Sequence, residues 1–260
     1  MMRWKGHWLA GFVALAALLL CGCTGVGMVK KALSKIFPPP PAELIIRLKS
    51  EDADLRRQSV VSLGRIRNVK ELSGVLKIMG MLGRHDLDPT VRSAAIGVMG
   101  RIGEAQFVEP LQKVLELDKD AGVRADAALA LGKFKQPEAR EALIAALGTD
   151  PSGDVRTAAA ANLRSYNSTD AAEALAEGLE DRDPAVAYAC SECLRYVTGQ
   201  DLPAEQSAWL AYLSENKEPY AKYGKMPRAR KMPDQREEDR DKRSWFKRLF
   251  PLERRVSELD

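Results

Sequence analysis

The chain has 260 residues, of which 45% are hydrophobic and 29% are charged, enough apolar material for one sizeable core. Its net charge of +4 falls to +2 without residues 1–22. This excess of positive charge is too small to indicate a nucleic-acid partner. Two of the four cysteines lie in the N-terminal apolar segment and the remaining two make no disulfide framework, and His85 is the only histidine after residue 22. We therefore expect no metal site and no cofactor.

The N-terminus has the order of charged and apolar residues that is typical of a secretory signal. The short basic start Met1–His7 precedes the uninterrupted apolar run Leu9–Leu20, and Cys21 and Cys23 follow it closely. A retained transmembrane helix is the alternative, because Leu9–Val29 carries no charge over 21 residues, a length that crosses a bilayer. Three glycines in the second half of this run favour a cleavage region over a helix.

The stretch Leu20-Cys21-Gly22-Cys23 resembles the lipobox of bacterial lipoproteins, with an aliphatic residue first and a small residue before the last cysteine. The resemblance implies that the lipoprotein signal peptidase recognises Leu20 and Gly22 and removes residues 1–22. Cys23 would then carry the lipid and hold the chain at a membrane. Because Thr24 stands where an Asp tends to retain such proteins at the inner membrane, we expect the outer membrane, facing the periplasm.

Residues 23–41 are expected to form a lipid-anchored tether. Lysines alternate with apolar residues between Met28 and Phe37, and Pro38–Pro41 stiffens the approach to the first helix. Two interpretations of the lysines are open. They either touch anionic lipid or belong to a solvated linker.

Between residue 42 and about residue 200 one pattern recurs, and it is clearest in Asp120–Phe134. Each copy has an acidic start, an anchor residue that Arg usually follows, and a segment rich in Ala and Leu. The anchors are 36, 32, 32 and 31 residues apart, and a period in this range indicates a solenoid of helical hairpins. The anchors are Leu55, Val91, Val123, Val155 and Val186.

Each copy is expected to form two antiparallel helices, with the second helix beginning near the anchor. Small residues stand at position +4 from the anchor and larger ones at +8 and +11, so these positions trace one face that neighbouring copies must bury together. Glycines 64, 100 and 132 at +9 either loosen the helix end or allow close approach. The first helices are predicted at Glu43–Lys49, Val69–Leu82, Gln106–Leu117, Glu138–Leu147 and Ala171–Leu179.

Aspartates mark the starts of the second helices. Asp88 and Asp183 each precede a proline, which suits an N-cap followed by the first helical turn. Asp54, Asp120 and Asp154 are predicted to cap in the same way.

This repeated pattern resembles HEAT repeats, and in particular the short subgroup that is named after the phycobilisome lyases. The resemblance covers about residues 42–200. It implies an all-α fold, an α-α superhelical solenoid of about five HEAT-like helical hairpins. Such a fold says little about function, because function lies in sites added to it. The lyases of the subgroup attach or remove bilin chromophores, and no separate lyase signature is present here.

Two rows of cations recur with the repeat. The row at +1 is either a basic stripe or an internal ladder to loop carbonyls and aspartates, and the recurrence of Asp88, Asp120 and Asp154 beside it favours the ladder. The row at +10 lies where the helix dipole by itself favours cations, yet it is the predicted contact surface for a protein partner. The first row is Arg56, Arg92, Arg124 and Arg156, and the second is Arg65, Arg101 and Lys133.

Residues 201–216 are predicted to form a capping helix whose Trp209 covers the last open face of the solenoid. Cys190 and Cys193 have the C-x-x-C spacing, but Cys190 occupies the small +4 position, so packing is favoured over a redox or zinc site. His85 is expected to be exposed in the turn Gly83–Asp86.

Residues 217–260 are predicted to form a charged tail. The mixed charge of Tyr220–Asp241 is typical of a disordered segment. Within the aromatic and basic segment that follows, Trp245, Phe246 and Phe250 are candidate docking residues for a partner or a membrane. The alternative is an apolar cluster that folds back on the end of the solenoid.

The sequence contains no nucleophile elbow, no glycine-rich phosphate loop and no acid pair at a sharp bend. We therefore expect a non-enzymatic, membrane-tethered scaffold that mediates protein–protein interaction at the bacterial cell envelope. The alternatives are a bilin-lyase-like enzyme or accessory protein, and a structural subunit of an envelope complex. The sequence does not identify the partner.

Overall fold

The computed structural model describes residues 39–66, 73–216 and 219–225, and every regular element in these ranges is a helix. The chain divides into two compact units, Met1–Tyr166 and Asn167–Asp260, called here the N-terminal and C-terminal units. The predicted signal with Leu20 and Gly22, the lipidation residue Cys23 and nearly all of the tether lie outside the described residues. So does the tail from residue 226 onward, with Trp245, Phe246 and Phe250.

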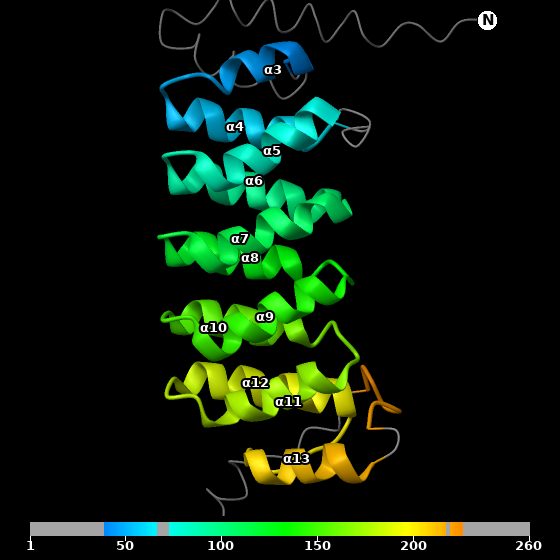
Figure 1. Cartoon of the computed structure of the whole chain (residues 1–260). Coiled ribbons are helices and arrows are strands. Elements are labelled where there is room, and N and C mark those ends of the chain that lie inside the picture. Colours follow the sequence, from blue (N-terminus) through cyan, green and yellow to red (C-terminus); the bar gives the residue numbers. More distant parts are fainter. Residues whose placement is uncertain (1–38, 67–72, 217–218, 226–260) are drawn as a thin grey trace, which may run out of the picture. The chain divides into compact units, whose positions relative to one another are not determined.

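The described part of the N-terminal unit consists of four helical hairpins, α3–α4, α5–α6, α7–α8 and α9–α10. The second helix of each hairpin packs on the second helix of the next, and α5, α7 and α9 pack in the same order, so the hairpins stack in two layers (Figure 1). This confirms the predicted helical solenoid. The helices are α3 (Pro41–Arg47), α4 (Ala53–Leu63), α5 (Ser73–His85), α6 (Pro89–Ile102), α7 (Val108–Leu117, preceded by the 3-10 turn η2, Ala105–Phe107), α8 (Ala121–Leu131), α9 (Pro137–Thr149) and α10 (Gly153–Leu163).

The predicted buried face of the second helices is confirmed. The valine anchors are at most 1% exposed, whereas Leu55, in the irregular first copy, is 38% exposed. The small +4 residues and the large +8 residues are buried in every copy, and Ser59 satisfies its buried hydroxyl by donating to the Leu55 carbonyl at 2.7 Å. Burying one leucine stabilises the fold by about 1.5–3 kcal/mol, so each copy of the repeat contributes to the stability of the stack.

The glycines at +9 allow adjacent second helices to approach closely. A Cβ atom at Gly100 would lie 2.9 Å from the Cβ and 3.0 Å from the Cα of Ala130, closer than real atoms come. Each glycine faces the residue at +7 of the next copy, so the requirement repeats at every junction. Close approach, and not a loosened helix, explains Gly100, because α6 continues past it to Ile102. The facing pairs are Gly64 with Val98, Gly100 with Ala130 and Gly132 with Asn162.

Three of the predicted N-caps are confirmed, and two are wrong. Asp54 and Asp154 lie inside the first turns of α4 and α10, where the helix dipole still favours a carboxylate. Asp52 caps α4 by accepting a hydrogen bond from the Asp54 N–H at 2.8 Å, and Ser152 occupies the cap position of α10. The confirmed caps, each accepting from a backbone N–H of the first turn, are Asp88, Asp120 and Asp183.

The C-terminal unit contains a further hairpin and a closing helix. Its elements are α11 (Thr169–Glu177), the 3-10 turn η3 (Gly178–Glu180), α12 (Pro184–Thr198) and α13 (Gln206–Glu215). α11 and η3 pack on α12, and α13 packs on α11. Trp209 of α13 is fully buried, with its ring edge-on to that of Tyr212. The predicted capping helix is present, but it begins at Gln206 and not near Asp201.

Residues 219–225 form turns that contact α12, which corrects the expectation of disorder from Tyr220 onward for this short part. The Gly224 N–H donates to the Tyr196 carbonyl at 2.9 Å, and the rings of Tyr223 and Tyr196 meet edge to face with centroids 5.5 Å apart. Charge composition alone did not show this hydrogen bond and this aromatic contact, which hold the chain beyond α13 against α12.

Candidate interaction surface

A ladder of arginine and aspartate side chains joins consecutive hairpins of the N-terminal unit. Arg92 on α6 donates from Nε and Nη2 to the two carboxylate oxygens of Asp118, at 2.7 and 2.8 Å. Asp118 follows the first helix of the next hairpin, so the pair crosses the junction between two hairpins. The other pairs with this two-bond geometry are Arg56–Asp86, at 2.9 and 2.8 Å, and Arg124–Asp150, at 2.8 and 2.9 Å.

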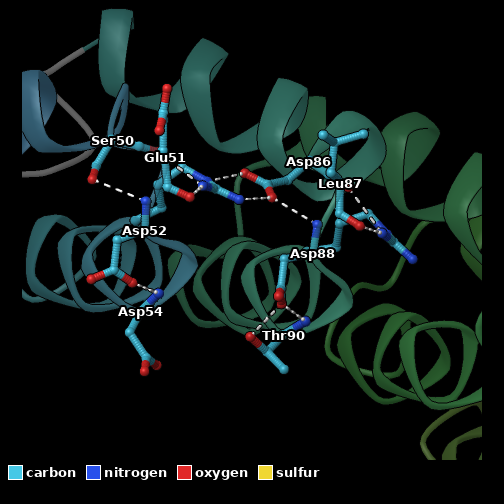
Figure 2. A network of polar contacts seen from close by, with 10 residues as sticks. Ser50, Glu51, Asp52, Asp54, Asp86, Leu87, Asp88 and Thr90 are labelled. Carbon is cyan, nitrogen blue, oxygen red and sulfur yellow. Dashed lines mark hydrogen bonds and ion pairs between the residues drawn. The ribbon is translucent and has the colours of Figure 1, made fainter.

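The same arginines also reach backbone carbonyls of the loop before their own helix. Arg92 Nη1 donates to the Asp86 carbonyl at 2.9 Å, while the Asp86 carboxylate accepts from Arg56 (Figure 2). Each aspartate thus binds two arginines, one through its side chain and one through its backbone. The Asp118 and Asp150 carbonyls accept in the same way from Arg124 and Arg156, both at 2.9 Å, so the ladder is continuous.

The pKa shifts of Arg124 and Asp150 show that the ladder pair is stabilised in its charged form. Burial raises the pKa of the Asp150 carboxyl, but hydrogen bonds from Arg124 and from the Ser152 N–H outweigh it and leave this pKa below its ordinary value. The hydrogen bond to Asp150 raises the pKa of Arg124 against the cost of its burial. The side chains of Arg92 and Asp118 are only 4% and 5% exposed. The +1 arginines therefore join hairpins, and the ladder interpretation is confirmed over the basic stripe.

The aspartates predicted for the ladder were the wrong ones. Asp88 and Asp120 cap helices, and the partner carboxylate comes from the residue two places earlier, Asp86 or Asp118. That carboxylate also accepts a hydrogen bond from the N–H of the capping residue, at 3.0 and 2.9 Å respectively. Ser50 holds the same place in the first hairpin, where its hydroxyl accepts from the Asp52 N–H (Figure 2). The missed signal was the exact 32-residue recurrence of Asp86, Asp118 and Asp150.

The +10 row differs from the ladder in exposure and pairing. Arg65, Arg101 and Lys133 are all exposed, and none of them forms an ion pair with a residue that the structure describes. The guanidinium of Arg101 lies against Gly64, since a Cβ there would be 3.1 Å from Arg101 Nη2. Because Gly64 directly precedes Arg65, the row continues from one hairpin to the next. These cations are available to a partner.

The two cysteines and the histidine singled out in the sequence all lie on helices. Cys190 and Cys193 form no disulfide and are buried within α12, and burial raises the pKa of the Cys190 thiol to about 12. A thiol of that pKa is neither a nucleophile nor a ready metal ligand at neutral pH. His85 is exposed, as predicted, but it is the last residue of α5 and not part of a turn, because the helix extends three residues beyond Leu82.

The comparison with known proteins agrees with this architecture. The stacked hairpins and their repeated junctions define a helical-repeat protein. Residues 81–164 match the family model described as HEAT repeats, the kind of repeat that the sequence pattern predicted for about residues 42–200. A search of the curated proteins found no match.

Solved structures add support for the fold alone. The X-ray structure of the Escherichia coli protein YibA is 21% identical in sequence with a TM-score of 0.54, over 83% of this chain and 81% of that chain. An engineered protein is 22% identical with a TM-score of 0.46, over 68% of this chain and 88% of its own. Human deoxyhypusine hydroxylase in complex with glycerol is 17% identical with a TM-score of 0.28, over 74% and 85%. The last two similarities are too low to support an argument.

Proposed function

We propose that this chain is a non-enzymatic scaffold, tethered to a membrane of the bacterial cell envelope, that binds a protein partner through the ends of its second helices. Solenoids of helical repeats offer extended surfaces that suit protein partners. The observation that carries the proposal is the contrast between the two rows of cations. The side chains of Arg56, Arg92 and Arg124 are at most 13% exposed and are paired with aspartates, whereas Arg65, Arg101 and Lys133 are exposed and form no ion pair with a described residue.

The composition of this face indicates an acidic partner surface. One helical turn before the cations of the row, at position +6, stand the uncharged residues Val61, Gly97 and Leu129, so no acidic side chain at that position neutralises the cations. Leu129, which is 49% exposed, offers one apolar contact within this face. A row of cations around such a contact corresponds to the polar rim and apolar core of protein interfaces.

Reversing two charges of the row tests this surface. The double change Arg101→Glu and Lys133→Glu is expected to reduce recovery of stable partners in a detergent pull-down by about tenfold or more, because it places like charges against an acidic surface. The matched control is Lys77→Glu with Lys119→Glu, which makes the same charge change at exposed, unpaired lysines outside the row. Full recovery of the same partners by the first variant would disprove the choice of surface.

The membrane tether is tested separately at its proposed acceptor. Cys23→Ala is expected to abolish processing of the leader and the mobility shift that lipidation gives, because no other residue would receive the lipid. Cys21→Ala is the control and should be processed normally, since the lipobox accepts Ala at that position. Unchanged processing and fractionation of the Cys23 variant would refute the lipid anchor. Among the described helices, none is both long and apolar enough to cross a membrane.

A bilin-lyase-like function is the second candidate, and it rests only on the subgroup resemblance of the repeats. A tetrapyrrole that absorbs light and co-purifies with the mature protein would favour it over the scaffold.

A further inference from the structure

A groove between the first helices α7 and α9 is left open in the N-terminal unit. It encloses about 560 Å³, a volume within the range of roughly 300–1,000 Å³ that is usual for binding pockets. The ladder pair Arg124–Asp150 borders one part of it. Its walls come from Leu115, Glu116, Glu141, Ala142, Ala145 and Ala146.

On the α9 side the groove is lined by small residues where another first helix carries large ones. When α5 and α9 are aligned on Asp86 and Asp150, Ala142 and Ala145 of α9 correspond to Ile78 and Met81 of α5. Two alanines at these positions cannot fill the space between α7 and α9. The apolar walls are therefore covered neither by α9 itself nor by its neighbour α7.

The rim of the groove is acidic. Glu116 on α7 and Glu141 on α9 are exposed, line the groove from opposite helices and form no ion pair with any described residue. Glu109 on α7, in contrast, is bound by Lys113 at 2.5 Å and does not line the groove. Two unpaired carboxylates beside an apolar wall select a ligand with large apolar side chains and adjacent cations.

We propose that this groove binds the segment Trp245-Phe-Lys-Arg-Leu-Phe-Pro-Leu252 of a second copy of the chain. The segment combines three large aromatic residues with Lys247 and Arg248. The aromatic side chains occupy the space above the alanines of α9, and the two cations meet Glu116 and Glu141. Each feature of the groove thus has its complement within eight consecutive residues. The proposal does not depend on the +10 row.

Photo-crosslinking of the full-length chain tests this assignment. A photoreactive phenylalanine analogue replaces Trp245, and crosslinked peptides are identified by mass spectrometry. Crosslinks are expected in α7 and α9, around Glu116 and Ala145. Ala145→Leu fills the groove at an exposed position and is expected to lower their yield by about tenfold or more. Glu116→Lys with Glu141→Lys should act similarly through charge repulsion, even if the filled variant folded poorly.

The control is Glu138→Lys with Glu177→Lys, an equal charge change at exposed glutamates outside the groove, and it should preserve the crosslinks. In a mixture of isotopically light and heavy chains, crosslinks between a light and a heavy peptide are expected, and crosslinks confined to single chains would contradict the proposal. Crosslinks at other residues, an absence of crosslinks, or a yield that both groove variants leave unchanged would overturn it. Because these variants leave Arg101 and Lys133 intact, the result is separate from that of the partner pull-down.

Discussion

Replacing Asp150 by alanine is expected to lower the free energy of unfolding by about 3–5 kcal/mol, because it leaves the buried guanidinium of Arg124 without its counter-charge. The two side chains are 6% and 10% exposed and share two hydrogen bonds. Urea unfolding followed by circular dichroism measures the loss. The double replacement Arg124→Met with Asp150→Leu should cost less than Asp150→Ala alone, since it removes both charges together. A larger cost for the double replacement would contradict this account of the ladder. Glu109→Ala, at an exposed pair, should change little.

The same pair predicts how stability depends on pH. The pKa of Asp150 is lowered in the folded chain, so its contribution is complete above the unfolded-state pKa of about 3.9 and is lost as pH falls from there through the folded pKa. The difference in urea midpoint between the natural chain and Asp150→Asn should therefore be constant near neutral pH and shrink below about pH 4. A difference that persists at lower pH would show that the carboxylate is not the group responsible.

Trp209→Ala is expected to destabilise the C-terminal unit by about 3–5 kcal/mol, because it empties a fully buried site where α13 packs on α11. The indole N–H donates to no described residue, so apolar packing accounts for the burial. Hydrogen exchange followed by mass spectrometry should show faster exchange throughout α13. Trp209→Phe, which keeps an aromatic ring against Tyr212, should have a smaller effect. Unchanged exchange in α13 would mean that Trp209 does not hold this helix in place.

Most of the fold could be predicted because its determinants are local in sequence. A helix face needs only residues at +4, +8 and +11 from an anchor, and one copy of the repeat contains them all. The N-cap residues were harder to predict, because an aspartate two residues before the predicted cap can accept the same kind of hydrogen bond from the first turn. Asp54 was therefore mistaken for the cap of α4, which is Asp52.

The candidate surfaces depended more on contacts between distant residues. The ladder partners are 26 or 30 residues apart, so a recurring aspartate could be assigned to Arg92 only when the hairpin junction was seen. The alanines of α9 looked like ordinary helix residues in the sequence. Only their position opposite Leu115 of α7 shows that they leave a groove.

The sequence by itself determined the helical class, the repeat period and the buried face, because each of these follows from the spacing of apolar and small residues along one chain segment. Only the tertiary structure decided which cations form ion pairs between hairpins and which remain exposed. Arginines at +1 and cations at +10 look alike in sequence. They differ because the stacking of hairpins brings a carboxylate within 3 Å of each paired +1 arginine and brings none to the +10 row among the described residues.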